Sequence, residues 1–195
     1  MDYGAKGLKW APFAAEDAEP AGALPNYGAS IDLGELIAVS DSPQFAEATA
    51  SGDNAVNRTI NRFTRNNVSA EVSEFSAEAA AAIFGAGIAA DTRTGPAKNL
   101  HFNDADNPPY GGMAFYVTSR EKGDVDKHYG VFYPKLKAVV QGKTYSTTGE
   151  SITLNSDKAN FTGLRCNSGD WKIVSELFDT EEEAADWRDQ MLAGT

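Results

Sequence analysis

Apolar and polar residues alternate along several segments of this chain, and a period of two is the pattern of a strand that buries one face. Between residues 68 and 72 the apolar positions are Val68, Ala70 and Val72, with a polar residue after each of the first two. Residues of one parity recur in five further segments, with Glu35 as an exception in the first. They are Ile31, Leu33, Ile37 and Val39; Met113, Phe115 and Val117; Phe132, Leu136, Ala138 and Val140; Ile152 and Leu154; and Trp171, Ile173, Ser175 and Leu177. One buried and one polar face is typical of antiparallel sheets, so the fold is expected to be mainly β.

Two residues are expected to interrupt these strands. Pro134 lacks the backbone N–H that a central strand donates, which predicts a sheet edge or a bulge at that point. Gly34 lies within the alternation that begins at Ile31, and it predicts a bulge as well.

Two helices accompany the strands, which makes the expected class α+β. The first is predicted over 76–84, where Ser76 has the side chain of an N-cap, an alanine run follows, and Gly85 suits the left-handed position at the C-terminal end. Its small side chains would let it pack closely on a sheet.

The second helix is predicted over 181–192. Thr180 and Glu183 have the spacing of a capping box, and a first turn of glutamates complements the positive end of the helix dipole. An apolar stripe includes Trp187 and Met191, so this helix is expected to lie flat on the domain through Trp187.

The 195 residues suit one domain with extensions. Residues 1–28 are rich in alanine, proline, glycine and acids and are expected to form an N-terminal arm, in which Trp10 and Phe13 predict a short strand that docks on the body. Residues 29–195 are expected to form the domain itself. It would include a turn-rich linker at 89–110, which contains a Gly-Pro and an Asn-Pro-Pro sequence.

The segment 40–67 is predicted to be a long, extended polar loop with few large apolar residues. Structureless loops beyond about 12–15 residues are uncommon in compact domains unless they have a function, so this one is expected to contact another molecule. Its candidate contact residues are Phe45, Glu47, Asp53, Arg58, Arg62 and Arg65. Because both signs of charge occur close together, an ion-pair surface between subunits is favoured over a phosphate site.

The charge balance limits the partners of the whole chain. There are 17 basic and 28 acidic side chains, and the formal net charge of −11 opposes binding to nucleic acid or to an anionic membrane surface. No apolar run of about 18 residues predicts a membrane span, and no apolar signal core is expected at the N-terminus. Cys166 is the single cysteine, which excludes an internal disulfide and fits a reducing cytosol.

No pattern in the sequence predicts a catalytic, cofactor-binding or metal site. The two histidines, His101 and His128, are far apart, and His128 is expected to be a cross-strand packing residue. Asp104 and Asp106 resemble the start of a calcium loop, but the glycine and glutamate that such a loop needs further along are missing. Cys166 has no histidine near it in the sequence to act as a base. The chain is therefore expected not to be an enzyme and to need no cofactor.

Several segments point to a known family when they are taken in order. They are YGAKGLKWAPF, LGELIAVSDSPQFAEATASGDN, NRFTRNNVSAEVSEFSAEAAAAIFGAG, GGMAFYVT, YGVFYPKLKAVVQGKTYSTTGESITL and the WRDQ helix near the C-terminus. Together they resemble a bacteriophage major tail protein, which is the tail-tube subunit of long-tailed phages. The resemblance covers nearly the whole chain, most clearly residues 31–85 and 111–155, and no feature of the linker at 89–110 aligns.

Membership in that family would imply an antiparallel β-sandwich or half-barrel with one packed internal helix. It would also imply that six copies form a ring, that rings stack into a hollow tube, and that DNA passes through the tube during ejection without specific binding. The segments 40–67 and 1–28 would make contacts between rings, and other tail components would bind the ends of the tube. The protein would be assembled in the host bacterial cytoplasm and would reside in the virion tail.

Two other classes of function stay open at this point. A monomeric β-sandwich that binds a ligand such as a carbohydrate would need an aromatic platform, and the candidates are Tyr110, Tyr116, Tyr129, Tyr133 and Trp171. Such a module is expected to stay monomeric on a sizing column and to retain its ligand. A hydrolase is the third class, and no residue pattern supports it.

Overall fold

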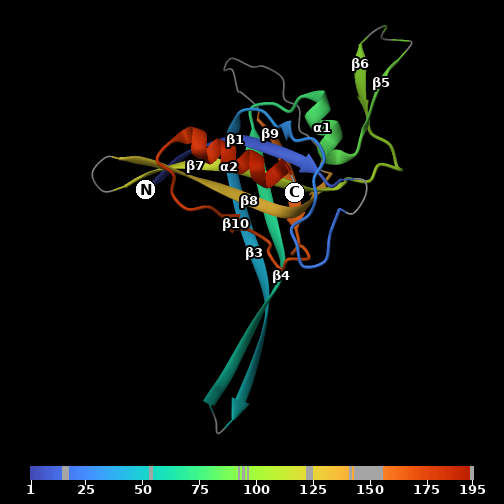
Figure 1. Ribbon diagram of the computed structural model, residues 1–195. Helices are drawn as coiled ribbons and strands as arrows, with labels where there is room; N and C mark the ends of the chain where they lie inside the picture. Colours follow the sequence, from blue (N-terminus) through green and yellow to red (C-terminus); the bar gives the residue numbers. More distant parts are fainter. Residues whose placement is uncertain are drawn as a thin grey trace, which may run out of the picture.

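Figure 1 shows the computed structural model, which describes residues 1–14, 18–52, 55–91, 93, 95, 97–121, 125–140, 142 and 156–193, with the backbone alone at 50–52 and 55–58. The strands of this part are β1 (Asp2–Pro12), β2 (Ile31–Asp32), β3 (Leu36–Gly52), β4 (Ala55–Val72), β5 (Gly87–Ala90), β6 (Lys98–His101), β7 (Tyr110–Arg120), β8 (Asp126–Val139), β9 (Asp157–Gly163) and β10 (Ile173–Val174). The helices are α1 (Ala77–Phe84) and α2 (Glu181–Ala193). The expected α+β class with a mainly β body is confirmed.

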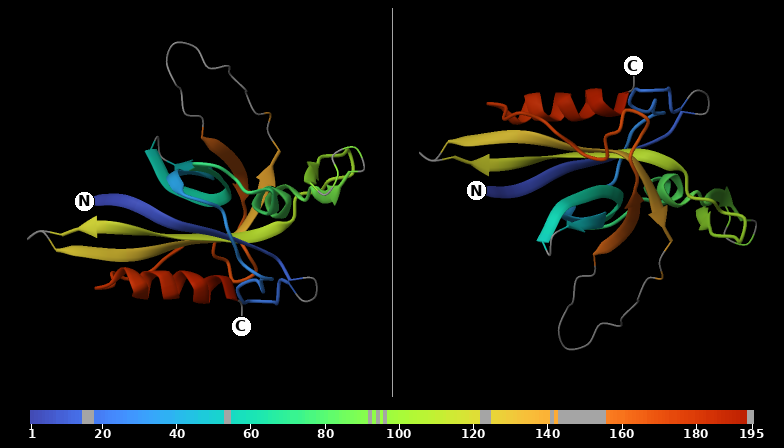
Figure 2. Two further views of the ribbon diagram at one scale, coloured as in Figure 1. Left: turned by 90° about the horizontal axis from the view of Figure 1, so that it is seen from above. Right: turned by 90° about the horizontal axis from the view of Figure 1, so that it is seen from below.

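Most of the strands belong to one antiparallel sheet. Their order is β2-β1-β7-β8-β9-β4-β3, and β10 pairs with the stretch of β8 that β9 leaves free. The sheet curves into a half-barrel, so that β3 at one end approaches β1 near the other end without pairing with it (Figure 2). The β5–β6 hairpin forms a separate small sheet.

The concave side of the half-barrel holds the main apolar core. Leu8 and Trp10 of β1, Met113 of β7 and Phe161 of β9 are buried there. The ring centroids of Trp10 and Phe161 are 5.4 Å apart. Helix α1 buries Ile83 against the same core and covers one end of it.

The alternation in the sequence predicts strands β4 and β7 correctly, but it predicts the exposed and buried faces of β4 alone. In β4, Val68, Ala70 and Val72 are all buried in the main core, as predicted. In β7, Met113 faces that core while Ala114 belongs to a second cluster beneath α2, so both faces of the strand are buried. The expectation of one buried and one polar face is therefore wrong for β7, because this strand is covered on both sides. The predicted pair Ile152 and Leu154 lies outside the described residues.

Pro134 produces the bulge that the sequence predicts, and the bulge changes which side chains share a face. The register of β7 and β8 shifts between Leu136 and Tyr133, where β8 contains one residue more than its partner. Phe132 consequently joins the cluster beneath α2, while Leu136 lies in the main core. The expectation that both residues share one face is wrong, because one inserted residue reverses the alternation.

Gly34 separates two strands instead of bulging one. It adopts a φ of 103°, and its backbone N–H donates to the carboxylate of Asp32 over 2.8 Å. The chain therefore turns between β2 and β3, and Leu33 is buried at the turn.

The N-terminal arm expected at 1–28 is not a separate extension. Strand β1 lies inside the sheet, paired with β7 along most of its length and with β2 at Lys9 and Trp10. Gly4 and Gly7 have φ of 67° and 65°, and the register of β1 shifts beside both. These two bulges interrupt the period of two, which is why the sequence pattern shows an arm where the structure has a strand.

The segment that follows β1 also belongs to the body. Phe13 forms a bridge with Tyr27, and the Tyr27 hydroxyl donates to the carbonyl of Pro134 over 2.7 Å. The docking expected for Trp10 and Phe13 is therefore confirmed.

Helix α1 begins and ends at the predicted residues. The backbone N–H of Ala79 donates to Ser76 Oγ over 3.1 Å, which is the bond of an N-cap. Gly85 has a φ of 70° and donates its N–H to the carbonyl of Ala81 over 2.8 Å. A glycine at this left-handed position avoids the cost that a side chain would impose.

Helix α2 begins with the predicted capping box and lies across the outer face of β7 and β8 (Figure 2). Glu183 accepts from the backbone N–H of Thr180 over 3.1 Å, and the N–H of Glu183 donates to Thr180 Oγ1 over 3.3 Å. Trp187 is half-buried and packs over Gly130 of β8, as expected. Arg188 is buried as well, which a helical stripe of apolar residues does not predict.

Two segments expected to be irregular are hairpins. Residues 40–67 belong to the long hairpin of β3 and β4, and part of the linker at 89–110 forms the β5–β6 hairpin before β7 begins. The expectation of a loop at 40–67 is wrong because the outer half of this hairpin exposes both faces. Polar residues then occupy both parities, and no alternation marks the strands.

Candidate functional site

Strands β3 and β4 extend beyond the body as a two-stranded ribbon (Figure 1). Strand β4 pairs with β9 only from Asn66 to Val72, so from Arg65 outward its one described neighbour is β3. On its other side β3 has no partner strand in the described part of the chain. We call residues 44–52 and 55–65 the projecting ribbon. Both of its edges leave backbone N–H and C=O groups free for another chain.

A bulge gives the projecting ribbon two different faces. The register shifts at Thr64, an extra residue on β4 whose hydroxyl donates to the carbonyl of Gln44 over 2.9 Å. Arg62 and Arg65 are three positions apart and would point to opposite sides of a regular strand. Because of the bulge they lie on the same face, and Phe63 lies on the other.

Three aromatic rings connect the root of the ribbon to the body. Phe45 is directly opposite Phe63, and their ring centroids are 5.9 Å apart at an interplanar angle of 76°. Phe63 in turn stacks on Trp171, with centroids 4.9 Å apart and planes inclined by 10°. Phe45 remains 53% exposed at the outer end of this stack.

A groove of about 550 Å³ lies beside this stack. The groove exists because the pairing of β9 with β4 ends at Gly163, opposite Asn66. Beyond this point the chain no longer pairs with β4, so the edge of β4 from Arg65 outward is left uncovered by β9. The lining residues are Arg62, Phe63, Thr64, Leu164, Arg165, Gly169 and Trp171. The groove thus combines an aromatic wall with two arginines.

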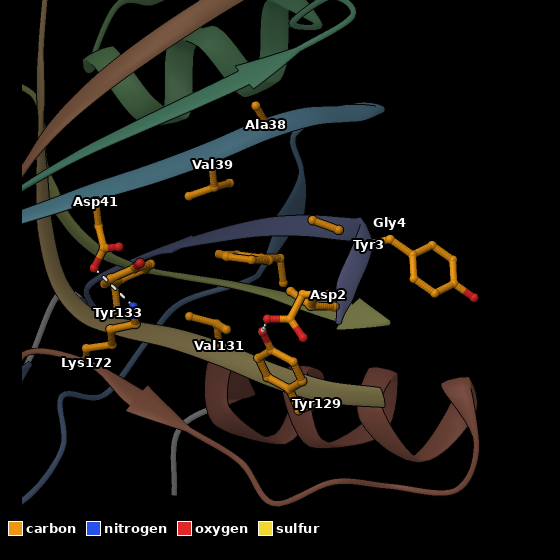
Figure 3. A pocket seen from close by; sticks show the side chains of 13 residues that line it. Asp2, Tyr3, Gly4, Ala38, Val39, Asp41, Tyr129, Val131, Tyr133 and Lys172 are labelled. Atoms are coloured by element: carbon orange, nitrogen blue, oxygen red, sulfur yellow. Dashed lines mark hydrogen bonds and ion pairs between the residues drawn. The ribbon is translucent and has the colours of Figure 1, made fainter. Parts of the chain in front are cut away.

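On the concave side, Asp41 ties β3 to the body (Figure 3). Its carboxylate accepts from Lys172 Nζ over 3.1 Å and from Asn66 Nδ2 over 3.4 Å. Burial, and then the charge of Asp41, raise the pKa of Tyr133 above its ordinary value. Asp41, Lys172 and Tyr133 border a cavity of about 370 Å³ between β3 and strands β1, β7 and β8. Its other walls include Val39 and Val131. Since the Asp41 carboxylate already accepts from two donors, its role is to attach β3 to the body.

The predicted contact residues are placed on the ribbon as follows. The exposed side chains are Phe45, Glu47, Arg62 and Arg65. None of the three charged ones forms an ion pair with another side chain that the structure describes. Arg58 is opposite Ala50 in the register, but its side chain lies outside the described part, as does the whole of Asp53. An ion-pair surface between subunits stays a prediction.

Reasoning from the sequence missed the part of the site that the body contributes. Arg165, Trp171 and Lys172 all lie against the root of the ribbon. Asp41 and Lys172 are 131 positions apart, and no local pattern connects them.

The aromatic residues of the alternative binding platform do not share one surface. Tyr133 is buried in the core, and Tyr116 is buried beneath α2, where its hydroxyl donates to Glu181 over 2.9 Å. Tyr110 packs against Phe13, whereas Trp171 stacks at the root of the ribbon. Tyr129 and Tyr133 both line the cavity between β3 and β8, but the other three candidates lie elsewhere, so the five do not form one aromatic platform.

The residues that were considered for catalysis or metal binding have packing roles instead. His128 is opposite Thr118, with 3.2 Å between Nδ1 and Oγ1, which confirms cross-strand packing. Cys166 is buried, and its Sγ is 3.1 Å from Ser168 Oγ. Within the described ranges, no three His, Cys, Asp or Glu side chains form a group that could hold a metal ion.

Two further findings concern the chain as a whole. None of its described helices has the length and apolar character needed to cross a bilayer. Comparisons with protein-family models and with curated proteins find no match for this chain. Its function is therefore inferred from its own geometry and charge, together with the resemblance of its segments.

Proposed function

We propose that this chain is a structural subunit that assembles with identical copies into stacked hexameric rings, which form the hollow tail tube of a long-tailed bacteriophage. DNA passes through the lumen without specific binding, and other tail components close the ends of the tube. The subunit performs no catalysis. It assembles in the cytoplasm of the host bacterium and ends in the virion tail.

The projecting ribbon is the observation that carries the proposal. A two-stranded hairpin without further cover is marginally stable in water. This ribbon nevertheless exposes Phe45 and Ile60, which are 53% and 59% accessible. Among the described residues, neither of its outer backbone edges has a further partner strand. An extension of this kind gains stability when a second chain covers it, and identical chains supply that cover in a self-assembling tube.

The outer edge of β3 supports side-by-side assembly. β3 spans 17 residues, far more than β2 at the opposite end of the sheet, which spans two. Natural sheets usually shorten, charge or cover such an edge, because it pairs readily with another strand. A long free edge is therefore expected to be an interface, and joining sheets edge to edge would build the wall of a tube.

The charge of the chain fits a conduit for DNA. A lumen lined by lysine and arginine would bind phosphates and slow the passage of the nucleic acid. The net charge of −11 is repeated in every subunit, so a ring of copies opposes such binding.

Electron microscopy of the purified protein tests the proposal. Rings or tubes are expected at high concentration or after addition of a nucleating tail tip. A protein that remains monomeric under both conditions, as judged by microscopy and by analytical ultracentrifugation, would contradict it. Retention of a sugar by that monomer would instead support the carbohydrate-binding alternative.

A further inference from the structure

The arginines at the root of the projecting ribbon form one basic surface. Arg62 and Arg65 share a face of the ribbon because of the bulge at Thr64, and Arg62 and Arg165 both line the adjacent groove. All three side chains are exposed. Such a cluster is unusual in a chain whose formal net charge is −11.

These arginines have no carboxylate partner in the part of the chain that the structure describes. Other cations of the body do have one: Lys135 pairs with Glu19 at 2.6 Å, and Lys172 pairs with Asp41 at 3.1 Å. A guanidinium offers five donors in a planar fork that matches a carboxylate. The unpaired cluster at the groove is thus complementary to an acidic surface.

An acidic surface lies at the opposite end of the body from the root of the ribbon. Strand β4 continues from Arg65 at the root to Val72, after which a short segment leads to α1. About seven residue steps of about 3.3 Å each thus separate the root from this end by roughly 23 Å. Glu35, Glu74 and Glu78 are exposed at the α1 end, and the N–H of Ser73 donates to the carbonyl of Glu35 over 2.9 Å, which keeps these segments together. Figure 1 shows the ribbon and α1 on opposite sides of the body.

We propose that Arg62, Arg65 and Arg165 of one copy dock on Glu35, Glu74 and Glu78 of the next copy, so that subunits stack head to tail. The inference rests on the proposed self-assembly and adds its chemistry and polarity. A contact between two different ends of identical molecules is heterologous, and repeating it extends a filament without limit. Exposed charge pairs mainly steer association and set its register, so this contact makes stacking sensitive to salt.

Charge reversal on each side tests the docking. Arg62→Glu/Arg65→Glu is expected to raise the protein concentration needed for tube growth at least tenfold, and Glu35→Arg/Glu74→Arg is expected to do the same. A chain that carries all four changes is expected to recover tubes at a concentration within about threefold of the unmodified protein. Light scattering measures growth, electron microscopy identifies the product, and thermal unfolding checks that each variant is folded. Glu78→Gln, a milder change, is expected to weaken growth and to reduce its salt sensitivity, because one screened charge contact is lost.

The matched control is Arg93→Glu/Lys98→Glu, which changes the net charge equally on the other hairpin and is expected to leave growth unchanged. If Arg62→Glu/Arg65→Glu forms tubes at the same protein concentration as this control, the inference is overturned. It is also overturned if the variant with all four charge reversals does not recover tube growth. Loss of binding to a DNA duplex by Arg62→Glu/Arg65→Glu, with normal tube growth, would assign the surface to nucleic acid instead. Failure of the unmodified protein to assemble would refute the proposed function itself, and the docking with it.

Discussion

The guanidinium of Arg188 donates a hydrogen bond of 2.9 Å to the carbonyl oxygen of Gly7, and so joins the C-terminal helix to the N-terminal strand. Gly7 has a φ of 65° at a bulge of β1. A Cβ at this position would lie 2.3 Å from Arg188 Nη1 and 2.5 Å from the ring of Tyr116. The bulge, the buried arginine and the tyrosine face therefore form one tightly packed unit.

Gly7→Ala is expected to destabilise the protein by about 3 kcal/mol, because the left-handed backbone costs roughly 1–2 kcal/mol and the steric overlap adds to it. Gly4→Ala is the matched control, since Gly4 has a φ of 67° but no atom within 4 Å of the added Cβ. It should lose only about 1 kcal/mol. Urea unfolding measures both losses, and equal losses would show that the packing around Gly7 contributes nothing.

Trp187 and Gly130 are expected to depend on one another. A Cβ on Gly130 would lie 2.1 Å from the Trp187 ring, so Gly130→Ala should cost about 2–3 kcal/mol by displacing α2. Trp187→Ala should cost about 2 kcal/mol, less than the roughly 3–5 kcal/mol of a fully buried aromatic residue, because this ring is half-buried. The double variant should be more stable than the sum of the two losses predicts, since the space left by the indole accepts the new methyl group. Strict additivity in chemical denaturation would mean that α2 does not rest on Gly130.

Removal of the projecting ribbon is expected to separate folding from assembly. Gln44 and Arg65 are directly opposite, so residues 45–64 can be replaced by an Asn-Gly turn that reconnects the two strands. The shortened protein should keep its circular dichroism spectrum and unfold cooperatively, because the buried cores lie elsewhere. It should form no tubes under the electron microscope. Tube growth by this variant would exclude the ribbon as an interface.

The pH dependence of stability is expected to include a contribution from Asp126. Hydrogen bonds from Arg120 and then from Tyr3 lower the pKa of this carboxyl from 3.8 to about 2. A group whose pKa is lowered by folding stabilises the protein fully above its ordinary pKa, and this contribution disappears as the pH falls through the folded value. Asp126→Asn should therefore lower the urea midpoint at neutral pH. Between about pH 4 and about pH 2, the urea midpoint of this variant should fall less than that of the unmodified protein.

The control for this titration is Asp104→Asn, which removes an exposed carboxylate that forms no ion pair with a described side chain. Its urea midpoint should follow that of the unmodified protein over the same range. Parallel curves for Asp126→Asn and the unmodified protein would contradict the assignment to Asp126.

The amino-acid sequence by itself determined the elements whose signals are local. Ser76 and Gly85 mark the ends of α1, Thr180 and Glu183 cap α2, and alternation from Val68 to Val72 identifies the inner half of β4. Each of these signals depends on residues a few positions apart, which contact one another as soon as the element forms. The mainly β, α+β class followed from them.

Only the tertiary structure decided where β1 lies, which face Phe132 takes and that residues 40–67 pair as a hairpin. In each case a bulge or a doubly exposed ribbon removes the period of two, so the local pattern contains no signal. The root of the ribbon likewise depends on contacts such as Phe63 with Trp171, between segments that meet only after the sheet has curved. The physical reason is that such contacts form through packing of the whole chain, whereas caps and alternation form within a few residues.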